Sequence, residues 1–371
     1  MDLGGVRVLD LTRLLPGPYA TQLLADAGAD VVKVESPDRG DYAREMPPTT
    51  DEGVGRVFDA VNRGKRSVAL DLTTDTGLAA FDALAAEADA VIEGFAPGTA
   101  EQLGVGHKRL REVNPELVYC SLSGYGGTGP RRDRPGHDLN YVAATGLLDM
   151  NRQDDSEQPR VPGAPVADMA GGLAAAVAVL AGLLSREVGD GGGTYIDASL
   201  AEAALSVTMP TAALAFDNNP RPGETPLSGA YPWYDIYEAS DGWVTLAALE
   251  EPYWVAFCEA AGRPELADAH GTTDTAERAA LRETLADLFA ERSATEWERL
   301  CGDTGMLARV QTPREAVSDE TFRERGVVHD GRVGFPAQVN GSVPSGGEAV
   351  PARGEHTEEL LQEVNFDPDR L

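Results

Sequence analysis

The sequence predicts an α/β protein with a mainly parallel sheet, together with a second, smaller α+β domain. Its first half alternates short apolar runs rich in β-branched residues with helical segments, as repeated βαβ units do. A stretch rich in Gly, Pro and Asn at 216–232 interrupts this alternation. A hairpin pattern and further helices follow this stretch, so a different architecture begins there.

The strands of the predicted sheet are short apolar runs. They lie at 6–11, 31–36, 67–72, 90–95 and 117–123. Helical segments separate them at 18–29, 75–88 and about 107–113, a long Ala- and Leu-rich helix follows at about 169–187, and a further strand and helix share 195–207. A helix between successive strands lets them run in the same direction, which predicts the mainly parallel sheet.

The second part of the chain has the pattern of a small α+β domain. Residues 234–249 predict a hairpin, with Ser240, Asp241 and Gly242 at its turn. Helices are predicted at about 252–262, 275–291 and 295–303, and the tail at 355–364 is predicted to form a closing helix.

Charge is the unusual feature of the composition. The chain has 61 acidic and 31 basic residues, which gives a formal net charge of −30. Such acidity suits a protein that stays soluble in a salty cytoplasm, where a short Debye length screens self-repulsion, so we expect a halophilic source and a cytoplasmic location. We expect no nucleic-acid partner, because contacts with phosphates need a basic face.

Cysteine spacing and hydropathy exclude other classes. Cys120, Cys258 and Cys301 form no CxxC pair, and the histidines form no HxxxH or HxH pattern, so we expect reduced thiols and no metal site. No signal-peptide pattern opens the chain. The longest apolar run, at 173–184, is too short to span a bilayer and predicts a buried helix, so we expect no membrane partner.

Glycine-rich and basic loops at three places in the sequence are candidates for binding a phosphorylated ligand. GYGGTG at 124–129 matches G-x-G-x-x-G, but PRRDRPG follows it and cannot form the helix that a dinucleotide site requires. Basic residues gather at 62–67 and 130–135, next to strand ends where ligands of α/β sheets bind. These loops therefore either hold a polyanionic ligand or present solvated arginines.

Acidic and imidazole groups at three places in the sequence are candidates for chemistry. His137 stands beside Asp138 in RPGHDLNY, and its chemistry alone favours a structural histidine held at a loop–helix junction. Asp168 in VADMAGG immediately precedes the Ala-rich helix, where it can cap the helix and also accept a proton or attack a carbonyl. Glu250 and Glu251 follow an apolar strand, where they cap a helix or orient an imidazole.

Taken together, these segments resemble the class III CoA-transferase superfamily, and within it most the α-methylacyl-CoA racemases. The segments that carry the resemblance include GVRVLDLTRLLPGPYATQLLADAGADVVKVE, NRGKRSVALDL, VIEGFAPGTAEQLGVG, NPELVYCSLSGYGGTGP, GHDLNY, VADMAGG and SGAYPWYDIYEASDGWVTLAALE. The resemblance implies an interlocked homodimer with active sites between subunits. It implies a large Rossmann-like domain at 1–215, to which 330–371 returns, a small domain at 225–325, and linkers at about 205–230 and 320–335.

The resemblance also implies roles for particular residues. Racemase-like members carry G-H-D-[IL]-N-Y and use its histidine with a downstream aspartate as acid and base, which here implies His137 and Asp168. Glu250 matches their supporting glutamate. Transferase members generally lack that histidine and form an acyl anhydride on the same aspartate. We therefore expect a racemase or epimerase of 2-methylacyl-CoA thioesters, with a CoA-transferase as the alternative and no cofactor beyond the CoA of the substrate.

Contacts with CoA are harder to assign, because Ala96 and Ser36 stand where characteristic racemases carry or commonly carry arginines. The remaining candidates are Lys33, Lys65, Arg66, Leu72, Gly124, Tyr125, Gly126, Arg131 and Arg134. The loop LSGAYPW at 227–233 also departs from the usual racemase pattern L-D-G-G-A-P near the acyl chain, which leaves the acyl preference open.

Overall fold

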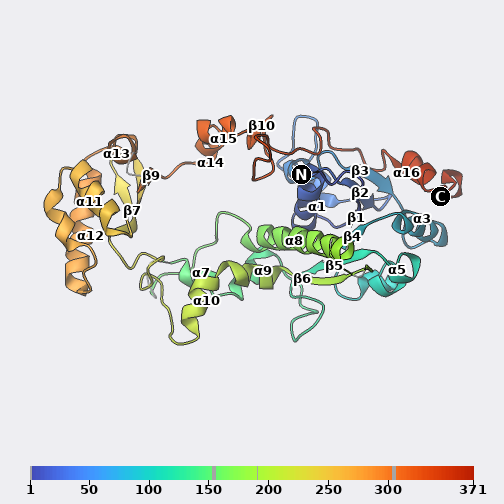
Figure 1. Cartoon of the computed structure of the whole chain (residues 1–371), viewed down its shortest axis with the longest axis horizontal. Helices are drawn as coiled ribbons and strands as arrows, with labels where there is room; N and C mark the ends of the chain where they lie inside the picture. Colours follow the sequence, from blue (N-terminus) through green and yellow to red (C-terminus); the bar gives the residue numbers. More distant parts are fainter. Residues whose placement is uncertain (1, 153–155, 190, 303–305) are drawn as a thin grey trace. The chain divides into compact units, whose positions relative to one another are not determined.

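The computed structural model describes residues 2–152, 156–189, 191–302 and 306–371. The chain divides into two compact units (Figure 1). Unit 1 comprises Met1–Thr145, Pro162–Thr208 and Asp319–Leu371, and unit 2 comprises Gly146–Val161 and Met209–Ser318. Residues 146–161, which we expected in the large domain, thus belong to unit 2.

A six-stranded parallel sheet forms the centre of unit 1, with the strand order β3-β2-β1-β4-β5-β6. The strands are β1 (Arg7–Leu11), β2 (Asp30–Glu35), β3 (Arg66–Ala69), β4 (Ala90–Glu93), β5 (Val118–Ser123) and β6 (Tyr195–Ser199). The predicted strands and their parallel arrangement are confirmed. The strand order reverses between β1 and β4, and in such sheets ligands bind outside the carboxyl ends of the strands at this reversal.

Helices cover both faces of this sheet. The helices of unit 1 are α1 (Pro16–Asp26), η1 (Tyr42–Glu45), α2 (Arg56–Val61), α3 (Asp75–Ala86), α4 (Thr99–Gln102), α5 (His107–Val113), α6 (Asp138–Ala143), α8 (Val166–Val188), α9 (Leu200–Val207), α15 (Glu320–Glu324), α16 (Thr357–Glu363) and η4 (Pro368–Arg370). A short hairpin, β10 (Val328–His329) and β11 (Arg332–Val333), precedes α16. Helices α1 and α8 pack together on one face, whereas α3 and α16 pack on the other.

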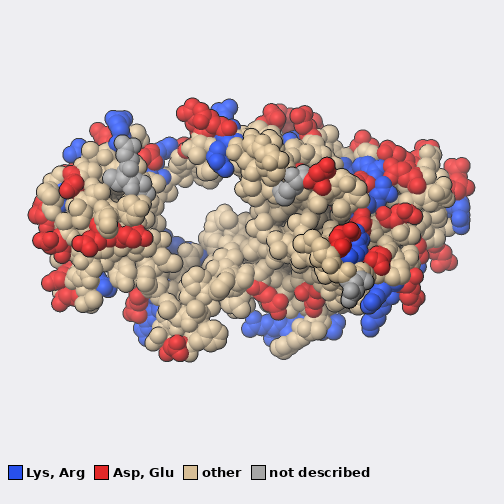
Figure 2. Space-filling view, in the orientation of Figure 1, with Lys and Arg blue, Asp and Glu red and all other residues tan. Residues whose placement is uncertain are grey.

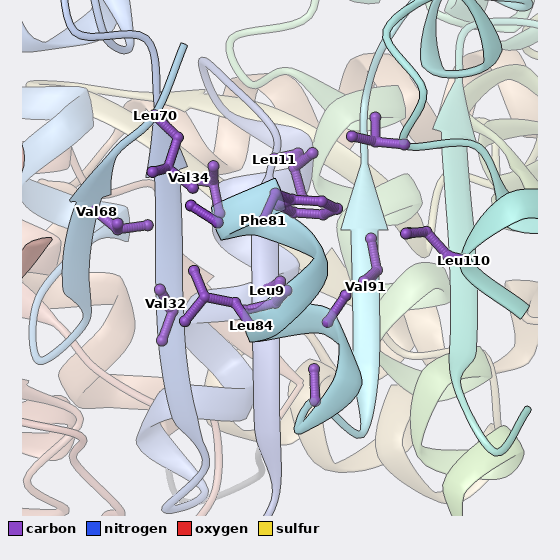
Figure 3. Close-up of a cluster of buried hydrophobic side chains, with 14 of the residues drawn as sticks. Leu9, Leu11, Val32, Val34, Val68, Leu70, Phe81, Leu84, Val91 and Leu110 are labelled. Carbon is purple, nitrogen blue, oxygen red and sulfur yellow. The ribbon is translucent and has the colours of Figure 1, made fainter. Parts of the chain in front are cut away.

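The apolar core beneath α3 shows why the strands and this helix form together. Thr74 caps the helix by accepting a hydrogen bond from Gly77 N at 3.0 Å. Phe81 and Leu84 are fully buried and lie over the strands (Figure 3). Burial of each such side chain stabilises the fold by about 1.5–3 kcal/mol. Alternation along β1 turns Leu9 toward α3 and Asp10 toward α1.

Helix α8 extends further than predicted and is buried on one face only. Small residues allow its close contact with α1, since a Cβ added at Gly172 would lie 2.6 Å from the carbonyl oxygen of Pro16. The opposite face exposes a row of apolar side chains: Leu173, Val177, Leu180, Leu184 and Val188. The prediction of a buried helix is therefore wrong for this face. By length and composition α8 is apolar enough to cross a membrane, but its packing on α1, β5 and β6 accounts for the apolar inner face.

Unit 2 contains a three-stranded antiparallel sheet in the order β7-β8-β9. Its elements are α7 (Leu147–Met150), α10 (Met209–Ala215), β7 (Tyr234–Ala239), β8 (Gly242–Ala247), α11 (Glu251–Ala260), η2 (Pro264–Ala269), α12 (Thr275–Ala290), α13 (Ala294–Cys301), β9 (Leu307–Arg309) and α14 (Pro313–Ala316). The predicted hairpin and the α+β character are confirmed. Residue 303, where we expected α13 to end, lies outside the described residues.

Acidic side chains are scattered over the visible surfaces of both units (Figure 2). Because the formal net charge is −30, these carboxylates repel one another in the folded state. Raising KCl from 0.1 M to 1 M shortens the Debye length from about 10 Å to about 3 Å. We expect the thermal unfolding midpoint to rise by several degrees over this range. Scanning calorimetry measures it, and a midpoint that stays constant or falls with salt would contradict this expectation.

Candidate active site

A cavity of about 500 Å³ lies at the carboxyl ends of β1, β4 and β5. Residues 12–14 follow β1, residues 94–97 follow β4, and residues 122–124 end or follow β5; all of them line the cavity. The cavity is thus at the reversal of strand order, where α/β sheets bind their ligands. Its volume is within the usual range for small-molecule sites.

His137 and Asp168 both line this cavity. His137 is exposed and immediately precedes α6, where its backbone N–H donates to Asn140 Oδ1 at 3.0 Å. Asp168 is the third residue of α8, because the helix begins at Val166 and Pro165 occupies the N-cap position. The prediction that Asp168 precedes and caps the helix is therefore wrong, but the structure brings its carboxyl and the imidazole to one cavity.

Asp138, the first residue of α6, provides the cap that Asp168 does not. Its Oδ1 accepts hydrogen bonds from Ala167 N at 2.7 Å and from Asp168 N at 3.1 Å. These are two of the backbone donors that the start of an α-helix leaves without an intrahelical partner. One carboxylate oxygen therefore joins the beginnings of α6 and α8, and the Asp168 side chain is not needed for capping.

The ionisation of Asp168 is shifted toward neutral pH. Burial raises the pKa of its carboxyl to about 6; repulsion from Asp138 adds to this shift, and attraction to His137 opposes it. A carboxyl whose pKa is near the working pH can both accept and return a proton. A perturbed carboxyl beside an imidazole in a cavity is the pattern typical of an active site.

The glycine-rich turn after β5 shapes the wall of the cavity. Gly124 lines the cavity, and a Cβ added there would lie 2.4 Å from Cε1 of Tyr141. The Tyr141 hydroxyl donates to the carbonyl of Gly136 at 2.6 Å, which holds the segment before His137. Tyr125 packs edge-on against Tyr141, with ring centroids 5.1 Å apart. Gly124 and Tyr125 thus support the His137 segment.

Gly126 lies close to an acidic side chain. The neighbouring Gly127 N–H donates to both carboxylate oxygens of Asp197 on β6, at 2.8 and 3.0 Å. A Cβ added at Gly126 would lie 3.7 Å from Asp197 Oδ1. A carboxylate that already occupies this turn repels a phosphate, so the geometry does not favour the predicted CoA contact at Gly126.

Lys33 and Lys65 are buried and serve an internal ion network, which corrects their assignment as CoA contacts. Lys33 Nζ lies 3.1 Å from Asp41 Oδ2 and donates to the carbonyl of Thr12 at 2.9 Å. Lys65 Nζ lies 3.1 Å from Asp10 Oδ2. Both lysine side chains are fully buried, so a phosphate cannot reach them. The network instead holds the segment after β1 that lines the cavity.

Arg66 also forms ion pairs within the protein. Its guanidinium pairs with Asp30 at 2.5 Å and with Glu363 at 2.6 Å, which ties β3 to β2 and α16. This arrangement leaves the predicted phosphate contact at Arg66 unsupported, because carboxylates already occupy its donors.

The arginines that line the cavity differ from those predicted. Arg134 does line it, and Arg132 joins it from the same loop. Arg131 lies 5.8 Å from the ring centroid of Tyr125. Arg13, which sequence analysis missed, follows β1 and lines both this cavity and a second one of about 180 Å³. Its place two residues after the first strand was the only signal in the sequence, and no motif accompanies it.

The second cavity contains Leu72, another predicted contact. Leu70, Leu72 and Leu103 contribute apolar walls there. Thr12, Arg13 and Phe95 line both cavities, so the two are neighbours at the same edge of the sheet. Together they form a site of two adjoining cavities, with Arg13 on the wall of both and His137 and Asp168 on the wall of the larger one.

Glu250 belongs to unit 2, whereas His137 and Asp168 belong to unit 1. It is exposed and occupies the N-cap position of α11. Within the described part of the chain, its side chain makes no capping hydrogen bond with the helix. Its predicted supporting role at the imidazole stays a prediction.

The fold and the cavity define a doubly wound α/β protein in which an imidazole and a carboxyl line a cavity at the reversal of the strand order. The chain belongs to CoA-transferase family III, whose model matches residues 3–357. This match confirms the resemblance predicted from the sequence.

Relatives of this chain include both transferases and racemases. Succinyl-CoA:mesaconate CoA-transferase from Haloarcula hispanica is 36% identical, with 98% of this chain and 96% of the relative covered. Alpha-methylacyl-CoA racemase from Homo sapiens is 32% identical, with 100% and 95% covered. The crystal structure of a CAIB/BAIF family protein from Brucella suis has a TM-score of 0.84 at 31% identity, with 98% and 99% covered. The fold class is therefore confirmed, and the family contains two kinds of acyl-CoA chemistry.

Proposed function

We propose that this protein is a racemase or epimerase that interconverts the two hands of 2-methyl-branched acyl-CoA thioesters. The observation that supports it most strongly is that His137 and Asp168 line one cavity. Inversion at an α-carbon needs a base on one face and an acid on the other. A neutral imidazole and a carboxyl that titrates near neutral pH can exchange these roles according to the hand of the substrate.

The proposed reaction conserves protons in each direction. The Asp168 carboxylate removes the α-proton, which breaks the C–H bond and leaves an enolate of the thioester. The imidazolium of His137 then returns a proton to the other face of the same carbon. The enzyme ends with a protonated Asp168 and a neutral His137, which is the starting state for the opposite hand. The pKa of about 6 at Asp168 suits both roles.

The neighbouring cavities suit the two parts of an acyl-CoA. A protein with a net charge of −30 needs local positive charge to hold a polyphosphate, and Arg13 and Arg134 supply it. Arg132, on the same wall, lies 3.1 Å from Asp133. The smaller cavity beside Leu72 offers apolar walls for a nucleotide base. In this arrangement the thioester reaches the larger cavity, next to His137 and Asp168.

A CoA-transferase is the second candidate. The Haloarcula hispanica relative, a transferase, is 36% identical, compared with 32% for the human racemase. In this reaction the Asp168 carboxylate attacks the thioester carbonyl and expels CoA thiolate, which forms an acyl anhydride. CoA thiolate then attacks the Asp168 carbonyl of this anhydride, which releases the first carboxylate and leaves CoA as a thioester on Asp168. A second carboxylate attacks that thioester and expels CoA thiolate, which attacks the new acyl carbonyl to give the product thioester and the free Asp168 carboxylate. The imidazole of His137 has no required role in these steps.

Two incubations separate the candidates. In the first, one enantiomer of a 2-methylacyl-CoA is incubated with the protein, and the hydrolysed acid is analysed by chiral chromatography. In the second, succinyl-CoA is incubated with mesaconate, and new CoA esters are separated by liquid chromatography. We expect loss of optical purity in the first incubation. Retained optical purity with a new CoA ester in the second would establish the transferase instead.

The exposed row on α8 supports the proposed homodimer. Leu173, Val177, Leu180, Leu184 and Val188 give this face a continuous apolar stripe in unit 1, which a second copy would shield from water. A homodimer therefore has twice the mass of the 39.2 kDa chain.

A charged substitution at the centre of the exposed row on α8 tests the proposed dimer. We expect Val177→Asp to reduce the dimer fraction strongly, because burial of an unpaired carboxylate in an apolar interface is costly. Val333→Asp is a matched control, since both valines are 65% exposed. Light scattering after size-exclusion chromatography measures the mass. A monomeric parent protein, or equal masses for both variants and the parent, would contradict the proposal.

A further inference from the structure

The carboxylate of Asp138 is connected to both candidate catalytic groups, and the proposed reaction gives it no role. Asp138 follows His137 directly in the chain, and it contacts the backbone of Asp168 from a different helix. The 2.7 Å bond to Ala167 N and the 3.1 Å bond to Asp168 N share a single oxygen, Oδ1. One side-chain oxygen therefore connects the residue next to His137 with the backbone of Asp168.

A further hydrogen bond fixes the backbone of His137 to the same helix that carries Asp138. The His137 backbone N–H donates to Asn140 Oδ1, so the first turn of α6 fixes the position of the imidazole's own backbone. The start of α8 is in turn fixed to the first residue of α6 by Asp138. The two helix beginnings thus form one unit, and displacement of Asp138 moves Asp168 relative to His137.

We propose that Asp138 is a positioning residue: its hydrogen bonds to the start of α8 fix the spacing of His137 and Asp168, and its negative charge lies next to the reacting carboxyl. This inference deepens the proposed function and rests on Asp168 as the reacting carboxylate. It holds for acyl transfer and for α-proton exchange with the substrate hand from which Asp168 removes the proton, because both need Asp168 ionised and in place.

The two roles of Asp138 can be separated by substitution. Asp138→Asn keeps a side-chain oxygen that can accept both backbone hydrogen bonds, but it removes the negative charge. Asp138→Ala removes the charge and the hydrogen bonds together. Loss of the negative charge favours ionisation of Asp168, so the pKa of Asp168 falls. With the substrate enantiomer from which Asp168 removes the α-proton, the acid limb of the pH–rate profile therefore moves to lower pH.

Other charged and titratable groups surround Asp168, and the substitution leaves all of them in place. His137 shares its cavity. The cavity wall contributes Arg13, Tyr42, Arg132, Asp133, Arg134 and Tyr141. The elements packed on α8 contribute Tyr19 of α1, Tyr119 and Cys120 of β5, Tyr195 and Asp197 of β6, and Glu202 of α9. A shift confined to the Asp138 variants therefore reports the charge at that one position.

The test is the pH dependence of kcat/KM and kcat for the parent protein and three variants. Asp75→Asn is the control, because Asp75 is exposed on α3, on the opposite face of the sheet, and carries the same change of charge. We expect Asp138→Asn to keep kcat at its plateau within a few-fold, with its acid limb at lower pH. We expect Asp138→Ala to lower the plateau of kcat roughly 10- to 100-fold, since small displacements of a reacting group have effects of this size.

Circular dichroism of each variant establishes that it is folded. The inference is overturned if folded Asp138→Asn keeps the acid limb of the parent, or if Asp138→Ala keeps its plateau. If the parent exchanges no α-proton, the proposed racemase function fails by itself. The same profiles are then recorded for CoA transfer, where the same two outcomes support or overturn the positioning role.

Discussion

Replacement of His137 by alanine is expected to reduce α-proton exchange by roughly 10²- to 10⁴-fold, the usual effect of removing a general acid or base. The imidazole lines the cavity beside Asp168 and is the second proton-transfer group of the proposed pair. Any transfer of CoA between carboxylic acids should change little in the same variant, because anhydride formation at Asp168 does not require an imidazole.

His107→Ala is the matched control for this variant. His107 stacks on Tyr195 at a centroid distance of 4.0 Å, at the start of α5 and outside the cavity that contains His137. Exchange is measured from the loss of optical purity of a single enantiomer. An exchange rate in His137→Ala equal to that of His107→Ala would remove His137 from the mechanism.

Replacement of Asp168 by asparagine is expected to have the largest effect, a loss of roughly 10³-fold or more in both exchange and transfer. Asparagine keeps the shape of the side chain but can neither accept the α-proton nor attack a thioester. Asp168→Ala is assayed beside it, so that slow deamidation of the asparagine cannot restore the carboxylate unnoticed. Retention of more than a tenth of either activity in both variants would contradict the assignment.

The same replacement should not weaken the fold. The pKa of Asp168 is raised in the folded state from 3.8 to about 6, so its ionisation opposes folding above about pH 6. Stability from this group is fully present below the unfolded pKa and is lost as the pH rises through the folded pKa. We therefore expect Asp168→Asn to unfold at a higher temperature than the parent at pH 7. The difference should shrink toward pH 4, and a variant less stable than the parent at pH 7 would indicate a structural role instead.

The regular part of the fold could be predicted from the sequence because its signals are local. Short β-branched runs alternating with helical segments predict the parallel sheet of unit 1, and the pattern at 234–249 predicts the hairpin of unit 2. The first residue of α8 was harder to predict from the sequence. Its cap comes from Asp138, which is distant in sequence, and no local pattern around Asp168 reveals that contact.

The site could be predicted only in part, because burial and long-range pairing decide which charged groups meet a ligand. Lys33 and Lys65 were expected to face phosphates, but Asp10 and Asp41 fold beside them and neutralise them in the interior. Arg13 was overlooked because a single arginine after a strand carries no motif of its own. Its position at the edge of the sheet becomes visible only when the carboxyl ends of neighbouring strands are brought together.

The central claim is that His137 and Asp168 exchange the α-proton of an acyl-CoA. The most direct measurement is incubation of the protein in D₂O with one enantiomer of a 2-methylacyl-CoA, followed by mass spectrometry and NMR of the recovered thioester. The account predicts one deuterium at the α-carbon, in both the inverted product and part of the recovered starting enantiomer. Absence of deuterium, together with a new CoA ester when a free carboxylate is supplied, would contradict it.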